Sequence, residues 1–314
     1  MSGDQEGWAE AGVHSIHSFG LFVPDIDEAK RFINAFGLSV EQRGNVLLVR
    51  VFGDDHVWLK VIQAERKALA YLSLGCYEDD FEQIRHQILA AGGRPAESSP
   101  YGSQQGFWFH DPDGNLIQLW VAPKMMPGDK AQLGDKSVPV GIQGAFFRST
   151  APKIQPSRLA HMLFFTGDMP RTLQFYEEGL GVKVADRSKN LVAFTYARHG
   201  CDHHLIAFVA SEQGRGFHHS AWDVPSIECV GLGAEQMRAA GYLHHWGVGR
   251  HVLGSNYFDY VQDPFGSWWE YSAHIDYIPK GVKWNGGDRD PADSLYLWGP
   301  SVPECFVQNN EINS

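Results

Sequence analysis

The strongest constraint on the fold is that the chain contains the same pattern twice. Segments 14–40 and 157–184 each alternate apolar residues, continue into a helical pattern and then reach glycine. Farther along, Gln87 matches Gln236 at the end of a second helical pattern, and Asp111 opens the same kind of Asp-Pro turn as Asp263. The offset between matched residues grows slowly along the chain, as expected for a duplication with small insertions.

Each copy begins with the same predicted elements. In the first copy, alternating apolar residues predict a strand, and apolar residues at helical spacing over 29–36 predict a helix. Asp25 or Asp27 is expected to cap the start of this helix, because a carboxylate there accepts from free backbone N–H groups. Gly37 is expected to end the helix, since glycine readily adopts the left-handed conformation found there.

The second copy predicts the matching helix after Met169 and Pro170, ended by Gly179 or Gly181. Each copy therefore contains two strand–helix–strands units, and the chain contains four. The predicted fold class is α+β, with paired βαβββ modules, four in total, that form two open barrel-like domains.

The repeat also predicts the domain boundaries. We expect an N-terminal domain over 1–130, a linker over 131–155 and a second domain over 156–275. Residues 276–314 are rich in Gly, Pro, Asp and Trp, which predicts an irregular tail. The aromatic residues of this tail indicate that it packs on the protein.

Composition excludes several classes of function. The 314 residues include 37 Asp and Glu against 26 Lys and Arg, for a net charge of −11 without basic blocks. Such a chain is a poor partner for nucleic acid or for an anionic membrane. It has no apolar run long enough to span a membrane, and its acidic start is not expected to be a signal peptide. The four cysteines form no CxxC pair, which favours a cytoplasmic location.

Matched positions on three predicted strands differ between the copies in a way that indicates a metal site. The second copy has His161, His219 and Glu270 where the first has His17, Tyr71 and Gln118. Two imidazoles and one carboxylate form the facial set that binds non-haem Fe(II) and leaves open positions for substrate and O₂. Because Tyr and Gln are weak ligands for Fe(II), the first domain is predicted to lack a metal site.

A motif near the end of the second copy resembles a family signature. It comprises Gly249-Arg250-His251, Asn256, Tyr260, Asp263-Pro264-Phe265-Gly266 and Glu270. The chain resembles, over about residues 12–275, the type I extradiol ring-cleavage dioxygenases of the vicinal oxygen chelate superfamily. It departs from their signature at Gly249-Arg250 and at Asp259, where the family prefers an apolar residue. Asp259 is expected to be a solvated strand residue.

A second motif, at residues 201–208, resembles the paired-histidine segment of the same family. The resemblance implies that His204 is the catalytic acid–base. Since side chains alternate along a strand, His203 is expected to point to the opposite face. The same reasoning makes His218 point away from His219, although His218 remains an alternative metal ligand.

The resemblance also implies roles for three residues of the first motif. His251 and Tyr260 are expected to be catalytic and to hydrogen-bond the substrate oxygens. Asn256 is expected to support substrate binding, and a simple turn residue is the alternative. The implied cofactor is Fe(II), with Mn(II) as the alternative, and O₂ is the co-substrate.

The implied reaction is the insertion of O₂ into a substituted catechol or a trihydroxylated ring, such as 2,4,5-trihydroxytoluene, during the degradation of aromatic compounds. The expected partners are a small aromatic diol and further copies of the chain in a homo-oligomer. Two other functions remain open. One is a glyoxalase-like, metal-dependent lyase or isomerase with a site shared between the copies, and the other is a metal-free protein that binds an aromatic compound.

Overall fold

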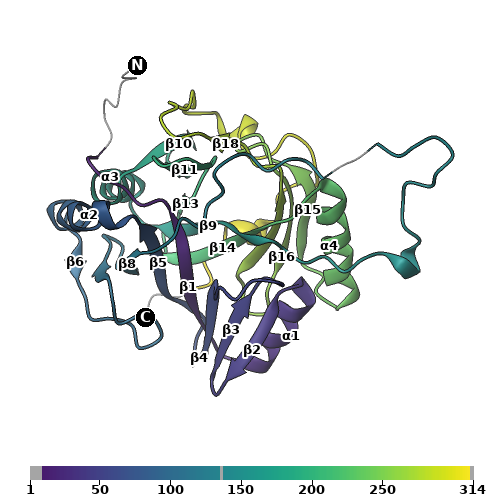
Figure 1. Cartoon of the computed structure of the whole chain (residues 1–314), viewed down its shortest axis with the longest axis horizontal. Coiled ribbons are helices and arrows are strands. Elements are labelled where there is room, and N and C mark those ends of the chain that lie inside the picture. The colour runs from purple at the N-terminus through teal and green to yellow at the C-terminus, as the bar shows by residue number, and fades with distance from the viewer. Residues whose placement is uncertain (1–8, 135–136, 312–314) are drawn as a thin grey trace.

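The structure is a computed structural model that describes residues 9–134 and 137–311 (Figure 1). The first sheet has eight strands in the order β2-β3-β4-β1-β5-β8-β7-β6. These strands are β1 (Ser15–Val23), β2 (Ser39–Arg43), β3 (Val46–Arg50), β4 (Leu59–Gln63), β5 (Ala68–Cys76), β6 (Arg94–Pro95), β7 (Phe107–His110) and β8 (Leu116–Val121).

The second sheet repeats this topology in the order β10-β11-β13-β9-β14-β17-β16-β15. Its strands are β9 (Arg158–Thr166), β10 (Val182–Ser188), β11 (Val192–Ala197), β13 (Ile206–Ala210), β14 (Gly216–Asp223), β15 (His245–Arg250), β16 (Tyr257–Gln262) and β17 (Trp268–Ala273). A small separate sheet pairs β12 (Cys201–Asp202) with β18 (Tyr277–Ile278). The predicted α+β class with four βαβββ modules is confirmed.

Four α-helices accompany the sheets in the part of the chain described: α1 (Ile26–Phe36), α2 (Glu78–Ala90), α3 (Met169–Leu180) and α4 (Ile227–Ala239). The structure decides between the alternatives for the helix ends. Asp25 caps α1 by accepting from the Glu28 N–H at 2.9 Å, and Gly181 ends α3 with a φ of 68°. None of these helices is long and apolar enough to cross a membrane.

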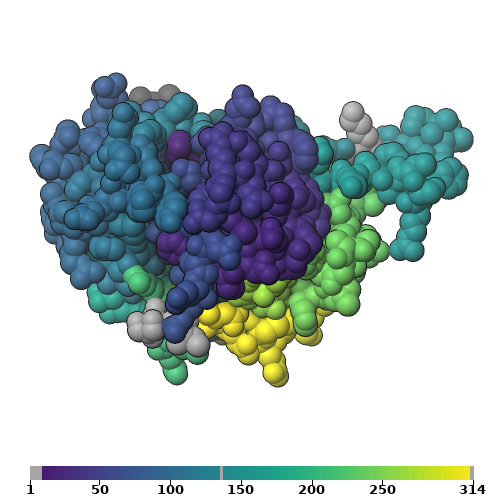
Figure 2. Space-filling model, turned by 90° about the horizontal axis from the view of Figure 1, so that it is seen from below, coloured from purple at the N-terminus to yellow at the C-terminus, as the bar shows by residue number. Residues whose placement is uncertain are grey.

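The two copies share one hydrophobic core. Helix α1 of the first copy packs against α4 of the second, and α2 packs against α3. The rings of Phe36 and Tyr271 stack at 4.1 Å, and the Tyr271 hydroxyl donates to the Phe36 carbonyl at 2.8 Å. Figure 2 shows the purple first copy directly against the green and yellow segments of the second. The first copy therefore supports the second by packing.

The tail packs on the second sheet, as its aromatic residues predict. Strand β18 pairs with β12, and the Phe306 side chain is buried. Near the end of the tail, Glu311 forms an ion pair with Lys67 at 2.7 Å and accepts from the Phe217 N–H at 3.0 Å. In Figure 1 the yellow tail, which includes β18, lies beside β10. By contrast, the linker over 137–150 is exposed and extends from the body beyond α4 (Figures 1 and 2).

His14 provides a pH-dependent contribution to stability. Its ring is fully buried, with Nε2 3.1 Å from the Ala122 carbonyl, and burial lowers its pKa to about 4. The unfolded chain then binds more protons than the folded chain below an unfolded pKa of about 6.5. Stability from this group is therefore present above that pH and is lost as the pH falls towards 4.

We expect His14→Gln to reduce the loss of unfolding free energy between pH 6.5 and 4.5 by about 2 kcal/mol. Urea unfolding at a series of pH values measures this, and identical pH slopes for both proteins would contradict it.

Candidate metal centre

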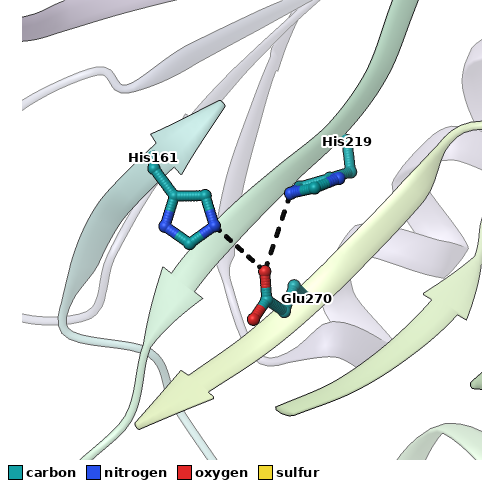
Figure 3. Close-up of side chains that lie close together, drawn as sticks. All are labelled: His161, His219 and Glu270. Atoms are coloured by element: carbon teal, nitrogen blue, oxygen red, sulfur yellow. Dashed lines mark hydrogen bonds and ion pairs between the residues drawn. The ribbon is translucent and has the colours of Figure 1, made fainter. Parts of the chain in front are cut away.

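Three buried side chains converge at the middle of the second sheet (Figure 3). His161 lies on β9, His219 on β14 and Glu270 on β17, and these strands are neighbours in the order β9-β14-β17. Nε2 of His161 lies 3.1 Å from Oε2 of Glu270, and Nε2 of His219 lies 3.6 Å from the same oxygen. The potential ligand atoms of the three residues all lie within 4.8 Å of one another. The structure thus brings together the set that was predicted from the repeat.

The geometry of these groups fits a divalent cation. Nε2 of His219 is buried and has no hydrogen-bond partner among the described residues, although an isolated buried polar atom is costly. Figure 3 shows both imidazoles directing a ring nitrogen at one carboxylate oxygen. Two neutral nitrogens and one carboxylate form the donor set typical of facial non-haem metal sites with open positions. A cation bound there would be coordinated by both ring nitrogens and by the carboxylate oxygen.

Asn256 positions the carboxylate of Glu270. Its amide nitrogen donates to Oε1 of Glu270 at 2.8 Å and to the Ser272 hydroxyl at 3.0 Å. This leaves the other carboxylate oxygen, Oε2, facing the two imidazoles. Such neighbours of metal ligands fix the orientation of the ligand. The observed contact is therefore with a prospective metal ligand, whereas the sequence predicts support for substrate binding.

His218 and the tail determine which nitrogen of His219 is free. Nε2 of His218 lies 2.7 Å from the Phe306 carbonyl, which can only accept, so this nitrogen carries the hydrogen. Burial lowers the pKa of His218 to about 3, so the ring is neutral and accepts at Nδ1. Nδ1 of His219, 2.8 Å away, must then donate, which leaves the lone pair of its Nε2 directed at Glu270.

The prediction that His218 points away from His219 is wrong. Both rings line the same cavity, because the pairing of β14 with β9 is irregular between Phe217 and His219. This irregularity interrupts the alternation on which the prediction relied. Because Phe306 already uses Nε2 of His218, the geometry favours His219 over His218 as a metal ligand.

A cavity of about 360 Å³ is lined by His161 and His219, two of the three converging residues. Its lining includes His204, His251, Asn256 and Tyr260. The ring centroids of His204 and His161 are 4.0 Å apart, and Nε2 of His251 lies 3.0 Å from the Tyr260 hydroxyl. The residues expected to act in catalysis or substrate binding, His204, His251, Asn256 and Tyr260, therefore line one cavity together with two of the three expected metal ligands.

Burial sets the protonation states around this cavity. It lowers the pKa of His204 well below its ordinary value, and the nearby His161 and His203 act in the same direction. Burial also lowers the pKa of His251, and together with Glu270 it raises the pKa of Tyr260 well above its ordinary value. At neutral pH the cavity thus offers neutral imidazoles, which can accept a proton, and a phenol that remains a hydrogen-bond donor.

Of two further expectations, the one for His203 holds in its outcome but not in its reason, and the one for Asp259 is wrong. His203 does not line the cavity that His204 lines, but strand alternation is not the reason, because both residues lie between β12 and β13. Nδ1 of His203 is 3.1 Å from Nδ1 of His204. Nε2 of His203 contacts Asp186 at 2.9 Å. Asp259 is not solvated: it is fully buried, and its carboxylate lies 2.7 Å from Nδ1 of His245.

The tail was expected to pack on the protein, but its direct contacts with the site were not predicted. The Leu295 carbonyl lies 2.7 Å from Nδ1 of His251, so that nitrogen donates and Nε2 accepts from Tyr260. The Phe306 carbonyl performs the corresponding function for His218. Backbone carbonyls are present at every residue, so no residue pattern could have identified these two.

The matching positions of the first copy do not form a comparable site among the described residues. Tyr71 is buried against Trp108, with ring centroids 5.7 Å apart. The amide of Gln118 donates to the Ser103 and Gln105 carbonyls at 3.2 and 2.8 Å. The side chains of Tyr71 and Gln118 are therefore engaged in other contacts.

We therefore expect the double variant His17→Ala and Gln118→Ala to keep the full metal content of the parent protein. Neither side chain contacts the second-copy cluster, so the loss should affect packing and stability alone. Elemental analysis after dialysis measures bound metal per chain. Loss of metal from this variant would instead indicate a site shared between the copies, as in the lyase or isomerase alternative.

Comparison with known proteins supplies independent information. Residues 158–271 match the sequence profile described as the Glyoxalase/Bleomycin resistance protein/Dioxygenase superfamily. Metapyrocatechase 2 of Cupriavidus necator is 50% identical over 299 residues, which cover 95% of this chain and 93% of that protein.

Solved structures share the fold. A Mn(II)-bound glyoxalase from Novosphingobium aromaticivorans has a TM-score of 0.75 at 23% identity, with 94% of each chain covered. The 2,2',3-trihydroxybiphenyl 1,2-dioxygenase of Sphingomonas wittichii has a TM-score of 0.71 at 20% identity, over 93% of this chain and 100% of that one. At such identities the likeness concerns the fold, since one fold hosts many activities.

Proposed function

The chain belongs to the extradiol dioxygenases of the vicinal oxygen chelate superfamily, and on this basis we propose that it opens the ring of a catechol-type diol with O₂. The observation that carries the proposal is the convergence of His161, His219 and Glu270 beside a cavity lined by His204, His251 and Tyr260. The metapyrocatechase, which is 50% identical in sequence and is matched over 93% of its length, supports the same reaction.

His161, His219 and Glu270 are the proposed metal ligands. When bound, a divalent ion supplies adjacent positions for both diol oxygens and O₂, so that the reactants are held in one orientation. Asn256 and His218 keep the ligand atoms of Glu270 and His219 directed at that position. The first copy is proposed to be structural, since its matching residues are occupied with other contacts.

His204 is the proposed acid–base. Its buried, neutral ring can take a proton from a diol hydroxyl and later return it to the product. His251 and Tyr260 form a hydrogen-bonded pair at the same cavity, where they can bind the substrate oxygens. The burial of these groups excludes water, which strengthens each of these interactions.

We propose Fe(II) as the metal and keep Mn(II) as the alternative. A set of two histidines and one carboxylate with open positions is typical of non-haem Fe(II) oxygenases. The structural likeness to a Mn(II)-bound glyoxalase concerns the fold and does not decide between the metals. Activity recovered by the metal-depleted protein on addition of each ion measures the preference.

The lining of the cavity supports a substrate with small, uncharged substituents. Apart from its histidines, the lining is mostly apolar and includes Leu163, Leu191, Val192 and Phe194. Among the described residues that line it there is no lysine or arginine. Methylated catechols and trihydroxylated rings such as 2,4,5-trihydroxytoluene remain within the proposed range, because neither requires a charged partner.

We expect 3-methylcatechol and 4-methylcatechol to be far better substrates than 3,4-dihydroxybenzoate. A carboxylate buried here without a cationic partner loses its hydration, which should lower kcat/KM by at least about 100-fold. An oxygen electrode with the Fe(II)-loaded protein measures the ratio, and unsubstituted catechol serves as the control. Equal kcat/KM values for the charged and the methylated rings would refute this substrate class.

We also propose that the chain forms a homo-oligomer and works in the cytoplasm. The linker exposes Val140, Ile142, Phe146 and Phe147, and apolar groups gathered on an extended segment favour contact with another protein surface. All four cysteines are free, which is typical of a reducing compartment.

A further inference from the structure

A chain of three buried side chains leads from the cavity towards the tail. Nδ1 of His204 lies 3.1 Å from Nδ1 of His203, and Nε2 of His203 lies 2.9 Å from Oδ2 of Asp186. All three side chains are almost fully buried. His203 and Asp186 do not line the cavity, so the mechanism proposed above does not use them.

The surroundings of Asp186 make it an acceptor. Oδ2 also accepts from the indole N–H of Trp284 at 2.8 Å, and Oδ1 accepts from the Gly287 N–H at 2.9 Å. Burial opposes ionisation of this carboxyl, but the hydrogen bonds from His203, Trp284 and Gly287 lower its pKa overall. An ionised carboxylate has no hydrogen to donate, so Nε2 of His203 must supply the hydrogen of their bond.

When Nε2 carries the one ring hydrogen of His203, the direction of the first bond fixes that of the second. A neutral His203 with its hydrogen on Nε2 has a lone pair on Nδ1. The facing Nδ1 of His204 must therefore carry a hydrogen and donate it. A neutral His204 then has an unprotonated Nε2, the nitrogen that is free to accept a proton from a substrate.

We propose that Asp186 and His203 are positioning residues that hold His204 in the tautomer with a free Nε2, and that the tail completes this arrangement through Trp284 and Gly287. The inference rests on the proposed function, because only an acid–base role makes this tautomer matter. In the Ser-His-Asp hydrolases, holding a histidine in the wrong tautomer lowers kcat by about 10⁴-fold.

The test compares His203→Asn with His203→Leu in the full-length protein. The two replacements have nearly the same shape, and both remove the contact with Asp186. Only asparagine keeps an acceptor at the position of Nδ1, from which it can bind the Nδ1–H of His204. We expect His203→Leu to lower kcat by at least about 100-fold with little change in KM, and His203→Asn to stay within about 10-fold of the parent. Equal losses of kcat in the two variants would reduce His203 to a packing residue and overturn the proposal.

A spectroscopic measurement reads the tautomer without relying on activity. In the Zn²⁺-loaded, nitrogen-15-labelled protein, the ring nitrogens of His204 give different signals according to which one carries the hydrogen. We expect a protonated Nδ1 and a free Nε2 in the parent and in His203→Asn, and a changed pattern in His203→Leu. Loss of the His204 signals in His204→Gln assigns them.

The outcomes separate the two proposals. A hydrogen on Nε2 of His204 in the parent protein overturns the positioning role even if the enzyme cleaves catechols. The expected tautomer in a protein that consumes no O₂ with any diol supports the arrangement and refutes the function. His245→Leu is the matched control, since it breaks another buried histidine–carboxylate contact outside the cavity, and it should leave kcat unchanged.

Discussion

Glu270→Gln is expected to abolish metal binding and ring cleavage while leaving the fold intact. The variant removes the negative charge and the carboxylate oxygen that faces both imidazoles. Removal of a group that merely orients a ligand costs about 10- to 100-fold in metal affinity, so loss of a direct ligand should cost more than about 100-fold. Turnover should then fall to the background rate.

The structure explains why the same variant should fold. Oε1 of a glutamine can still accept from Asn256, and its amide nitrogen can donate to the lone pairs of His161 and His219. It also removes a buried charge, which is costly without a cation. We therefore expect the metal-free variant to melt at or above the temperature of the metal-free parent. Elemental analysis and calorimetry on the dialysed proteins measure the two effects, and a variant that retains stoichiometric metal would show that Glu270 is not a ligand.

His204→Gln is expected to lower kcat by about 10²- to 10⁴-fold while the metal content and KM stay near those of the parent. The reason is that the ring lies at the cavity but is not one of the three converging ligands. Steady-state O₂ uptake and elemental analysis on the same sample provide the two readouts. His245→Gln, which changes a histidine away from the cavity, is the control and should turn over normally. Near-normal turnover by His204→Gln would show that His204 is not the acid–base.

The fold could be predicted because its signals are local and occur twice. Apolar periodicity and glycine ends mark the same elements in both copies, so each copy checks the other. The proposed metal ligands were predicted from the same repeat. Gln118 pairs with Ser73 as Glu270 pairs with Ala221, which places the histidine two residues before Ala221 at the position of Tyr71.

The rest of the site depends on contacts that the sequence does not encode locally. Strand alternation does not describe the two pairs of adjacent histidines. His218 and His219 follow an irregular strand register, and His203 and His204 lie between strands. Asp186 is far from His203 in the sequence and has no motif around it. The carbonyls of Leu295 and Phe306 enter the site through the course of the tail, which has no periodic pattern.

The central claim is that this chain inserts both atoms of O₂ into a diol beside the metal held by the second copy. The most direct measurement is the reaction of the Fe(II)-loaded protein with 3-methylcatechol under oxygen-18 gas, quenched rapidly and analysed by mass spectrometry. We predict one O₂ consumed per diol and a ring-opened product that carries both labelled atoms. An unaltered diol in the presence of bound iron, or a product without the label, would contradict this account and favour the lyase or isomerase alternative.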